Sequence, residues 1–259
     1  NVARQIEAGL DLVNNGEQPR EAFFLYLQRR MSGFGPGGHR AAFKDIRDHP
    51  DFAPIREAIF DGKPVVSNMT PPKVVGALKY LDPDAVAAEC RQFKRALEGQ
   101  NPTGTFLTAP SPGIAYLRAI TDAIAIEYRT IIEHGFDLQI DAPDLALEGH
   151  GHFADRPRSE FLAFVEQVID EIRRVTSGLP KDRIRLHACW GNYEGPHDAD
   201  VPIAEMLPIL TKAHAGAVLL PMANPRHQHE YRAFTPQNIP DDMSVIVGCI
   251  DTTTNYVEH

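Results

Sequence analysis

The sequence predicts an α/β protein built on a (β/α)8 barrel. Short apolar runs alternate with amphipathic helical patterns along the chain, which is typical of parallel strands joined by helices. Several of these runs end in polar residues of the kind that barrel enzymes use for chemistry. The length of 259 residues suits one barrel domain. We therefore expect a single catalytic barrel over residues 1–259.

The expected elements follow from apolar periodicity. A helix is predicted over residues 1–9, and two longer amphipathic helices over 121–133 and 159–175, where apolar residues recur every three or four positions. Seven apolar runs are predicted as buried strands: residues 10–13, 64–68, 105–108, 136–141, 183–189, 217–222 and 244–251. A complete barrel has eight strands, so we expect its first strand and a C-terminal segment to be missing from this chain.

Polar residues at strand ends favour a barrel over a doubly wound sheet. Barrel enzymes collect functional groups at the C-terminal ends of many strands, whereas a doubly wound sheet concentrates them near one switch point, usually with a glycine-rich phosphate turn. The sequence contains no GxxxxGK[ST] motif, and its GxGxxG match at residues 33–38 neither follows a predicted strand nor opens a predicted helix, so nucleotide binding has little support. The residues expected at or just after strand ends are Glu17, Asp141, His187 with Cys189, Asn224 and Asp251.

Composition excludes several functional classes. The net charge of -9 argues against a nucleic-acid partner, because phosphates attract basic surfaces. No apolar run approaches the ~20 residues of a membrane span. Three cysteines, far apart in the sequence, do not make a disulfide framework. We expect a cytoplasmic protein that acts on small molecules.

The most informative pattern is His187-Ala188-Cys189 at the end of a predicted strand. Residues two apart on a strand point to the same side, so an imidazole and a thiol would project together. Both are common zinc ligands. A buried thiol beside a hydrogen-bonded imidazole is the alternative interpretation. The polar loop over residues 190–197 favours the zinc interpretation, because polar loops at strand ends often carry function.

The other candidate residues each have a structural alternative. Asp141 is expected to face the barrel mouth, because Pro143 restricts Ala142 to extended geometry, but it could instead cap a helix. Glu17 could be a plain surface acid, and Trp190 could belong to the core or to a pocket wall. For the remaining candidates the structural role is the expectation: Cys90 inert within a helical pattern, Cys249 in the core, His150 and His152 exposed, and His227, His229 and Glu230 behind a site or on the surface.

Five segments occur in an order that resembles a known family. They are residues 9–17, 138–143, 187–189, 223–227 and 248–251. Together they resemble the catalytic barrel of cobalamin-independent methionine synthase and its short single-barrel relatives. The loop over residues 189–197 is most similar to the branch that includes epoxyalkane:coenzyme M transferase.

This resemblance implies a barrel like those of uroporphyrinogen decarboxylase and methionine synthase, and zinc-dependent alkyl transfer to a thiol. His187 and Cys189 match the first two zinc ligands. Glu17 and Asp141 match acids that hold the amino group of homocysteine, and Ser111 falls where the family lines the alkyl-donor side. We assign catalytic roles to His187, Cys189 and Asp141, and substrate binding to Glu17, Asp141, Ser111, Trp190, Asn192 and Asp251.

The chain also departs from the family. The last zinc ligand of the family, a cysteine, is expected to follow Glu258-His259, where this chain ends. Pro221 stands where the methionine synthases have a glutamate ligand, and Thr253 where they have a histidine that transfers a proton. The leading hypothesis is zinc-dependent methyl transfer to homocysteine or a similar thiol. Thiol addition to an epoxide and a catalytically impaired ligand-binding barrel are the alternatives.

The partners that follow from this hypothesis are small molecules. They are a thiol acceptor and an alkyl donor, for which methyltetrahydrofolate is one candidate. Neither nucleic acid nor a membrane is expected, and a homo-oligomer is one expectation for the assembly.

Overall fold

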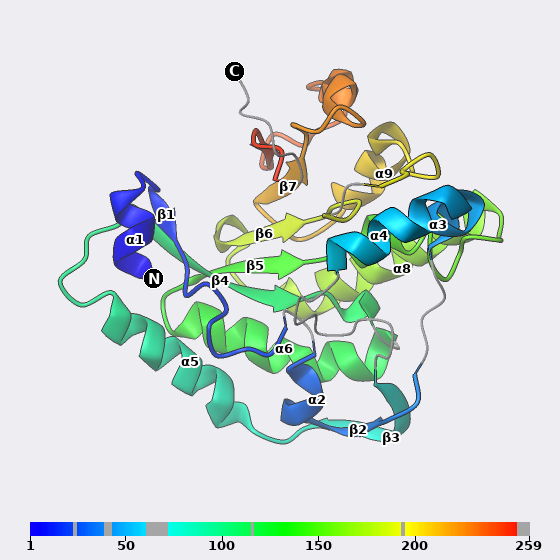
Figure 1. Ribbon diagram of the computed structural model, residues 1–259. Coiled ribbons are helices and arrows are strands. Elements are labelled where there is room, and N and C mark those ends of the chain that lie inside the picture. The colour runs from blue at the N-terminus through cyan, green and yellow to red at the C-terminus, as the bar shows by residue number, and fades with distance from the viewer. Residues whose placement is uncertain (23–24, 39–42, 61–71, 115–116, 193–194, 253–259) are drawn as a thin grey trace.

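A curled sheet of six parallel strands forms the centre of the fold, with the strand order β1-β4-β5-β6-β7-β8 (Figure 1). The computed structural model describes residues 1–259 except 23–24, 39–42, 61–71, 115–116, 193–194 and 253–259. The strands of this sheet are β1 (Leu12–Val13), β4 (Gly104–Pro110), β5 (Asp137–Asp141), β6 (Ile184–His187), β7 (Ala217–Pro221) and β8 (Ser244–Gly248). All neighbouring pairs are parallel.

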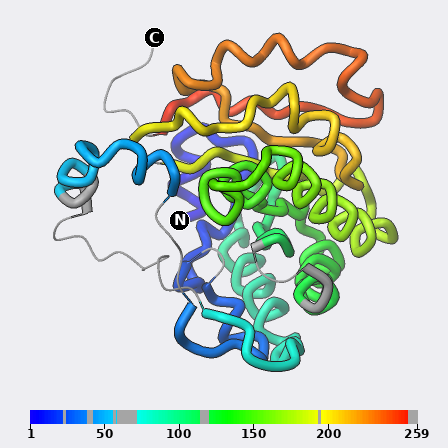
Figure 2. Tube along the Cα trace, turned by 90° about the vertical axis from the view of Figure 1, so that its right-hand side faces the viewer, coloured from blue at the N-terminus to red at the C-terminus, as the bar shows by residue number. Residues whose placement is uncertain are grey.

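Helices cover the outer side of this sheet. The helix α5 packs beside α6, α6 beside α8, and α8 beside α9, so the connections between successive strands form one layer (Figure 2). These helices are α5 (Pro83–Ala96), α6 (Leu117–Glu133), α8 (Arg158–Thr176) and α9 (Ile203–Leu210). The shorter helices are α1 (Val2–Glu7), α2 (Leu27–Arg30), α3 (Lys44–Asp48), α4 (Ala53–Phe60) and α7 (Asp144–Leu147). In the described residues no helix is both long and apolar enough to cross a membrane.

Short 3-10 helices and one antiparallel pair of strands complete the elements. The strands β2 (Met31–Gly35) and β3 (Lys73–Tyr80) pair with each other apart from the main sheet. Gly33 has a φ of 87°, and a Cβ there would lie 2.6 Å from the Ala77 carbonyl oxygen, so this close approach requires glycine. The 3-10 helices are η1 (Pro50–Phe52), η2 (Pro112–Ile114), η3 (Lys181–Arg183) and η4 (Gln228–Ala233).

The observed elements confirm much of the expected pattern. Six of the seven predicted strands correspond to β1 and β4 to β8, and the predicted helices to α1, α6 and α8. The seventh predicted strand, residues 64–68, lies outside the described residues. The hairpin of β2 and β3 was not predicted. Within the described residues β1 and β8 are the two edges of the sheet, so the structure shows a partial barrel of the TIM type.

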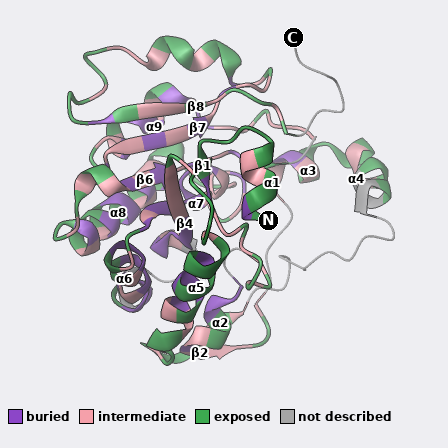
Figure 3. Cartoon of the chain, turned by 90° about the vertical axis from the view of Figure 1, so that its left-hand side faces the viewer, coloured by how far each residue is buried: buried purple, intermediate pink, exposed green. Residues whose placement is uncertain are grey.

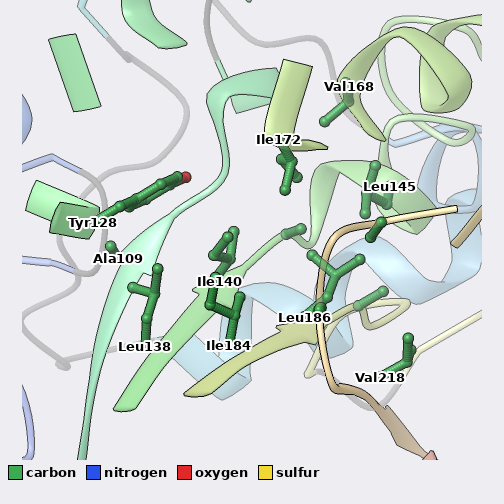
Figure 4. Packing of buried hydrophobic residues seen from close by; sticks show 14 of the residues in the cluster. Ala109, Tyr128, Leu138, Ile140, Leu145, Val168, Ile172, Ile184, Leu186 and Val218 are labelled. Atoms are coloured by element: carbon green, nitrogen blue, oxygen red, sulfur yellow. The ribbon is translucent and has the colours of Figure 1, made fainter. Parts of the chain in front are cut away.

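The core lies between the sheet and its helical layer. The register places Leu138 beside Ile184, and Ile140 beside Leu186, and all four are buried. Figure 4 shows them against Tyr128, Val168 and Ile172 from the helices, and Figure 3 shows the same layering by burial. Each such side chain contributes roughly 1.5–3 kcal/mol on burial, so this layer carries much of the stability of the fold.

The alternate residues of β5 and β6 face the inner side of the curled sheet. Successive side chains of a strand point to opposite faces, so Gln139, Asp141, Arg185 and His187 lie opposite the apolar layer. The Arg185 Nε donates to Gln139 Oε1 at 2.7 Å. Gln139 Nε2 donates in turn to Asp141 Oδ1 at 2.7 Å. A polar row therefore leads along the inner face to the C-terminal ends of these strands.

A buried charge cluster ties the segment after β1 to β4, α5 and α6. Arg20 Nε pairs with Glu89 at 3.0 Å, and its other nitrogens donate to Thr108 Oγ1 and to the Thr108 carbonyl oxygen. Arg30 pairs with both Glu89 and Glu127 at 2.8 Å. Burial alone would lower the pKa of Arg20, but the acidic side chains around it raise the pKa overall. Opposite charges thus compensate one another in this part of the interior.

Replacement of Glu127 by leucine tests this compensation. Glu127 is fully buried and accepts hydrogen bonds from Tyr26 and Tyr80 as well as from Arg30. We expect Glu127→Leu to lower the free energy of unfolding by about 3–5 kcal/mol, because it leaves a buried guanidinium partly uncompensated. Urea titration measures this change. Glu133→Gln, an exposed position on the same helix, is the control and should change stability little.

Candidate active site

The C-terminal ends of the parallel strands bring several predicted site residues to one rim of the sheet. The β5–β6 register places Asp141 directly beside His187, and Pro110 of β4 beside Asp141. His187 Nδ1 lies 2.9 Å from Asp141 Oδ1. Because an ionised carboxylate can only accept, this nitrogen carries a proton, and in a neutral imidazole Nε2 of His187 then keeps its lone pair. The His187 side chain is 25% exposed, so solvent can reach this imidazole.

Cys189 follows β6 by two residues and is a free, partly buried thiol. Burial raises the pKa of this thiol, the Gly191 N–H lowers it, and the carboxylates of Asp141 and Asp144 raise it further. The Asp141 carboxylate therefore accepts a hydrogen bond from His187 and also raises the pKa of Cys189. The imidazole, the thiol and the carboxylate belong to the same short stretch of the rim.

Glu17 reaches the rim from the loop after β1. It has a φ of 53°, and among the described residues it is the non-glycine residue with a positive φ. Backbone strain of this kind clusters at functional sites. Its Oε1 accepts a hydrogen bond from Thr108 Oγ1 and lies 3.5 Å from Arg20. The buried charge cluster thus holds this acid against the inner face of β4.

Ser111 lies at the end of β4 but its contacts are internal. The side chain is buried, its hydroxyl donates to Asp144 Oδ2 at 3.0 Å, and it accepts from the Gly113 N–H at 3.1 Å. The Ser111 N–H also donates to the Asp141 carbonyl oxygen at 2.8 Å. Ser111 therefore connects the ends of β4 and β5 to α7.

Trp190, Asn192 and Asp251 lie in a neighbouring part of the rim. They line a cleft formed by the segments after β6, β7 and β8. Asn224, Arg226 and Thr252 line the same cleft. Trp190 is buried and its indole N–H donates to the Val201 carbonyl oxygen, so this residue serves both the core and the cleft wall. His187 and Glu17 are not among the lining residues, but the cleft adjoins Cys189 through Trp190 and Gly191.

Behind this cleft lies a histidine–carboxylate cluster, which consists of Asp45, His150, His197, Asp200, His227 and Glu230. His150 lies between Asp45 and Asp200, with its Nε2 2.6 Å from Asp200 Oδ1. His227 hydrogen-bonds to Asp200 and Glu230, each at 2.7 Å. His197 Nδ1 lies 3.0 Å from Asp200. The cluster joins α3 to the segments that follow β5, β6 and β7.

The cluster corrects one expectation from the sequence, and Cys249 corrects another. His150 was expected to be exposed but is 2% exposed, because its carboxylate partners Asp45 and Asp200 come from distant segments. His227 is 3% exposed and lies behind the cleft, which is one of the two positions expected for it. Conversely, Cys249 was expected in the core and is exposed, because it follows an edge strand of the sheet. Trp190 depends on the cluster, because its indole stacks on His227 at a ring-centroid distance of 3.9 Å.

The cluster shifts the titration of its members. Burial would raise the pKa of Asp200, but hydrogen bonds from His150, His197 and His227 hold it well below its usual range. Burial would lower the pKa of His150, but Asp200 and Asp45 outweigh burial and raise it. Burial is also the main reason that the pKa of Asp45 is raised. The charges of the cluster therefore depend on one another.

Three members of the cluster have a spacing that a metal ion could use. One ligand atom each from Asp45, His197 and Asp200 lie within 4.8 Å of one another. His187 and Cys189 do not belong to a group of three with this spacing in the described part of the chain. The oxygens of Asp200 also lie 2.6, 3.0 and 2.7 Å from ring nitrogens of His150, His197 and His227.

The raised pKa of His150 predicts a pH-dependent stability. A group whose folded pKa lies above its unfolded value of about 6.5 stabilises the fold fully below that pH and loses the contribution as the pH rises through the folded pKa. Asp200 has the opposite sign, so its contribution is present above about pH 4 and is lost in acid. We expect the free energy of unfolding of the wild type to fall above about pH 6.5, and to fall less in His150→Gln.

Urea titrations over a pH series measure this difference. His152→Gln is the matched control, because His152 lies two residues away and is exposed. An equal pH dependence in the wild type and His150→Gln would show that His150 is not held by its carboxylate partners.

Comparisons with known proteins support the fold. No family model matches the chain, and no curated protein matches it. Among solved structures, the chain is similar to a B12-independent methionine synthase from Shewanella sp. W3-18-1, determined in complex with selenomethionine. The TM-score is 0.59 at 18% sequence identity, and the match covers 99% of this chain and 70% of that chain. This similarity shows a related barrel architecture.

Proposed function

We propose that this protein is a zinc-dependent transferase that moves a methyl group to a thiol, either homocysteine or a similar acceptor. The observation that carries the proposal is the Asp141–His187 hydrogen bond beside Cys189 at the rim of the parallel sheet. The similarity to a methionine synthase structure and the order of the sequence segments support the same assignment.

The donor set fits zinc. A metal-binding histidine usually donates its other ring N–H to a carboxylate, which orients the ring and raises its basicity. His187 has this arrangement with Asp141. Nε2 of His187 and Sγ of Cys189 would hold the ion, as two of the four ligands that zinc usually takes. When bound there, zinc would supply the Lewis acidity that keeps a substrate thiol in its thiolate form at neutral pH.

The side chains of the rim would hold and orient the substrates. Glu17 presents a carboxylate for a substrate amino group, and the strained backbone at Glu17 keeps that acid near β4. Asp141 has a second oxygen beyond the one that accepts from His187 and Gln139, so it could contact the same amino group. Fixed positions of this kind matter, because two substrates must meet in one geometry.

We also propose that the six strands belong to a complete (β/α)8 barrel. The parallel order of sequential strands and the curl of the sheet support this (Figure 1). Leu12 of β1 and Val247 of β8 are 47% and 50% exposed, and both lie on edge strands that a closed barrel would pair. Three free cysteines favour a reducing compartment, and we propose the cytoplasm.

Metal content and activity test the proposal together. We expect wild-type protein purified in reducing, chelator-free buffer to contain zinc and to methylate homocysteine with a methyltetrahydrofolate-type donor. His187→Ala and Cys189→Ser should lose both zinc and activity, because each removes a ligand. His197→Ala should retain zinc. Elemental analysis and mass spectrometry of the product measure these outcomes. Loss of zinc from His197→Ala alone would instead assign the metal to the Asp45 group.

Asp141→Asn tests the orientation of His187. The amide accepts a weaker hydrogen bond than the carboxylate, so we expect zinc affinity to fall by roughly 10- to 100-fold while the fold remains intact. Competition with a fluorescent zinc chelator measures this affinity. Asp137→Asn, a partly exposed position at the start of the same strand, is the control. Equal affinities in the wild type and Asp141→Asn would contradict the role of this carboxylate.

A further inference from the structure

Arg226 is a cation in the cleft that has no partner among the described residues. It follows β7, is half-buried and lines the cleft. In the described part of the chain its guanidinium makes neither an ion pair nor a hydrogen bond, whereas Arg20, Arg30 and Arg183 all pair with carboxylates. Guanidinium groups in partly buried places normally have an acceptor. A bound ligand could therefore supply the hydrogen-bond acceptor for Arg226.

The backbone that carries Arg226 is held in place. Asn224 Oδ1 accepts hydrogen bonds from the N–H groups of Arg226 and His227, at 3.1 and 3.0 Å. His227 is held in turn by Asp200 and Glu230. Two anchors thus fix the loop on either side of the Arg226 Cα. A preorganised cation loses less entropy when it binds an anion.

A second donor lies in the same cleft. Thr252 Oγ1 donates to Asn192 Oδ1 at 2.8 Å, and the NH2 group of Asn192 is a donor in the same cleft. Arg226 and Asn192 come from segments after different strands, and both line the cleft. Asp251 lines it too but already interacts within the protein. The available polar groups of Arg226 and Asn192 are therefore hydrogen-bond donors.

Charge and geometry identify the kind of ligand. The chain has a net charge of -9, so an uncompensated cation in a cleft is a local exception. Guanidinium binds planar or branched oxyanions with paired hydrogen bonds, and an amide NH2 group can add another. The cleft adjoins Cys189 through its lining residues Trp190 and Gly191.

We propose that Arg226 and Asn192 bind the anionic headgroup, carboxylate or sulfonate, of the small thiol that this protein uses. The assignment of the ligand as a thiol rests on the proposed function, whereas the anion site itself does not. Arg226 is then a specificity residue that selects thiols with a negative headgroup over neutral ones.

Calorimetric binding to the full chain tests this with four thiols and their non-thiol analogues. The thiols are homocysteine, 3-mercaptopropionate, 2-mercaptoethanesulfonate and neutral 2-mercaptoethanol, and the analogues are butyrate and ethanesulfonate. We expect Arg226→Gln to weaken every anionic ligand by about tenfold or more, which corresponds to 1.4 kcal/mol, and to leave 2-mercaptoethanol unchanged. Arg226→Lys should recover part of the loss, because it keeps the charge without the paired hydrogen bonds.

Arg232→Gln is the matched control. It removes the same charge, but from an exposed position on the neighbouring η4. The relative affinities of carboxylate and sulfonate ligands identify which headgroup the site prefers. Equal binding of anionic ligands by the wild type and Arg226→Gln, or an equal loss in Arg232→Gln, would overturn the proposal.

Repeating the series in Cys189→Ser separates this site from the proposed reaction. If zinc-dependent thiol chemistry is wrong, butyrate and ethanesulfonate should still bind in an Arg226-dependent way. If only the anion site is wrong, thiols should bind to the zinc-loaded wild type with no dependence on Arg226, and this binding should be lost in Cys189→Ser.

Discussion

The hydrogen bond between Asp141 and His187 depends on the register of two parallel strands, and the candidate site depends on that hydrogen bond. Leu138 and Ile140 of β5 are buried beneath the helices, so the alternate residues must face inward. A slip of one residue would turn every inward side chain into the apolar layer, which strongly disfavours any other register. The apolar layer therefore fixes the orientation of the imidazole, although none of its residues has a chemical role.

Two networks of buried charge hold the loops on either side of this pair. Arg20, Arg30, Glu89 and Glu127 secure the segment that carries Glu17. The histidine–carboxylate cluster secures the segments that carry Trp190 and Arg226. Buried ions add little net stability compared with apolar residues, but they tolerate few alternative arrangements once each charge has its partner. Loops fixed in this way can present functional groups at the rim of the sheet with little freedom.

The sequence predicted those features that depend on local pattern. Apolar runs located β1 and β4 to β8, and the strand-end position of Asp141 and His187 followed from the same runs. Features that depend on distant pairs were not predictable. His150 and Asp45 are 105 positions apart, and burial of the histidine makes sense only once its acids are known. The hairpin of β2 and β3 was missed because its residues are mostly half-buried or exposed and lack a clean alternation of burial. Arg226 could not be singled out from the sequence, because its lack of a partner among the described residues is a property of the folded chain.

The rim of the sheet is electrically asymmetric, and this asymmetry bears on how a substrate would lie. Glu17 comes from the segment after β1 and contacts β4, whereas Arg226 comes from the segment after β7. His187 and Cys189 follow β6, between these positions in the strand order. In an amino-acid thiol such as homocysteine the amino and carboxylate groups share one carbon, and the sulfur lies at the other end of the molecule. Whether that headgroup binds at Glu17 or at Arg226 would therefore decide from which side the sulfur approaches His187 and Cys189. Orientation, rather than the number of contacts, would then distinguish acceptors that differ in their headgroup.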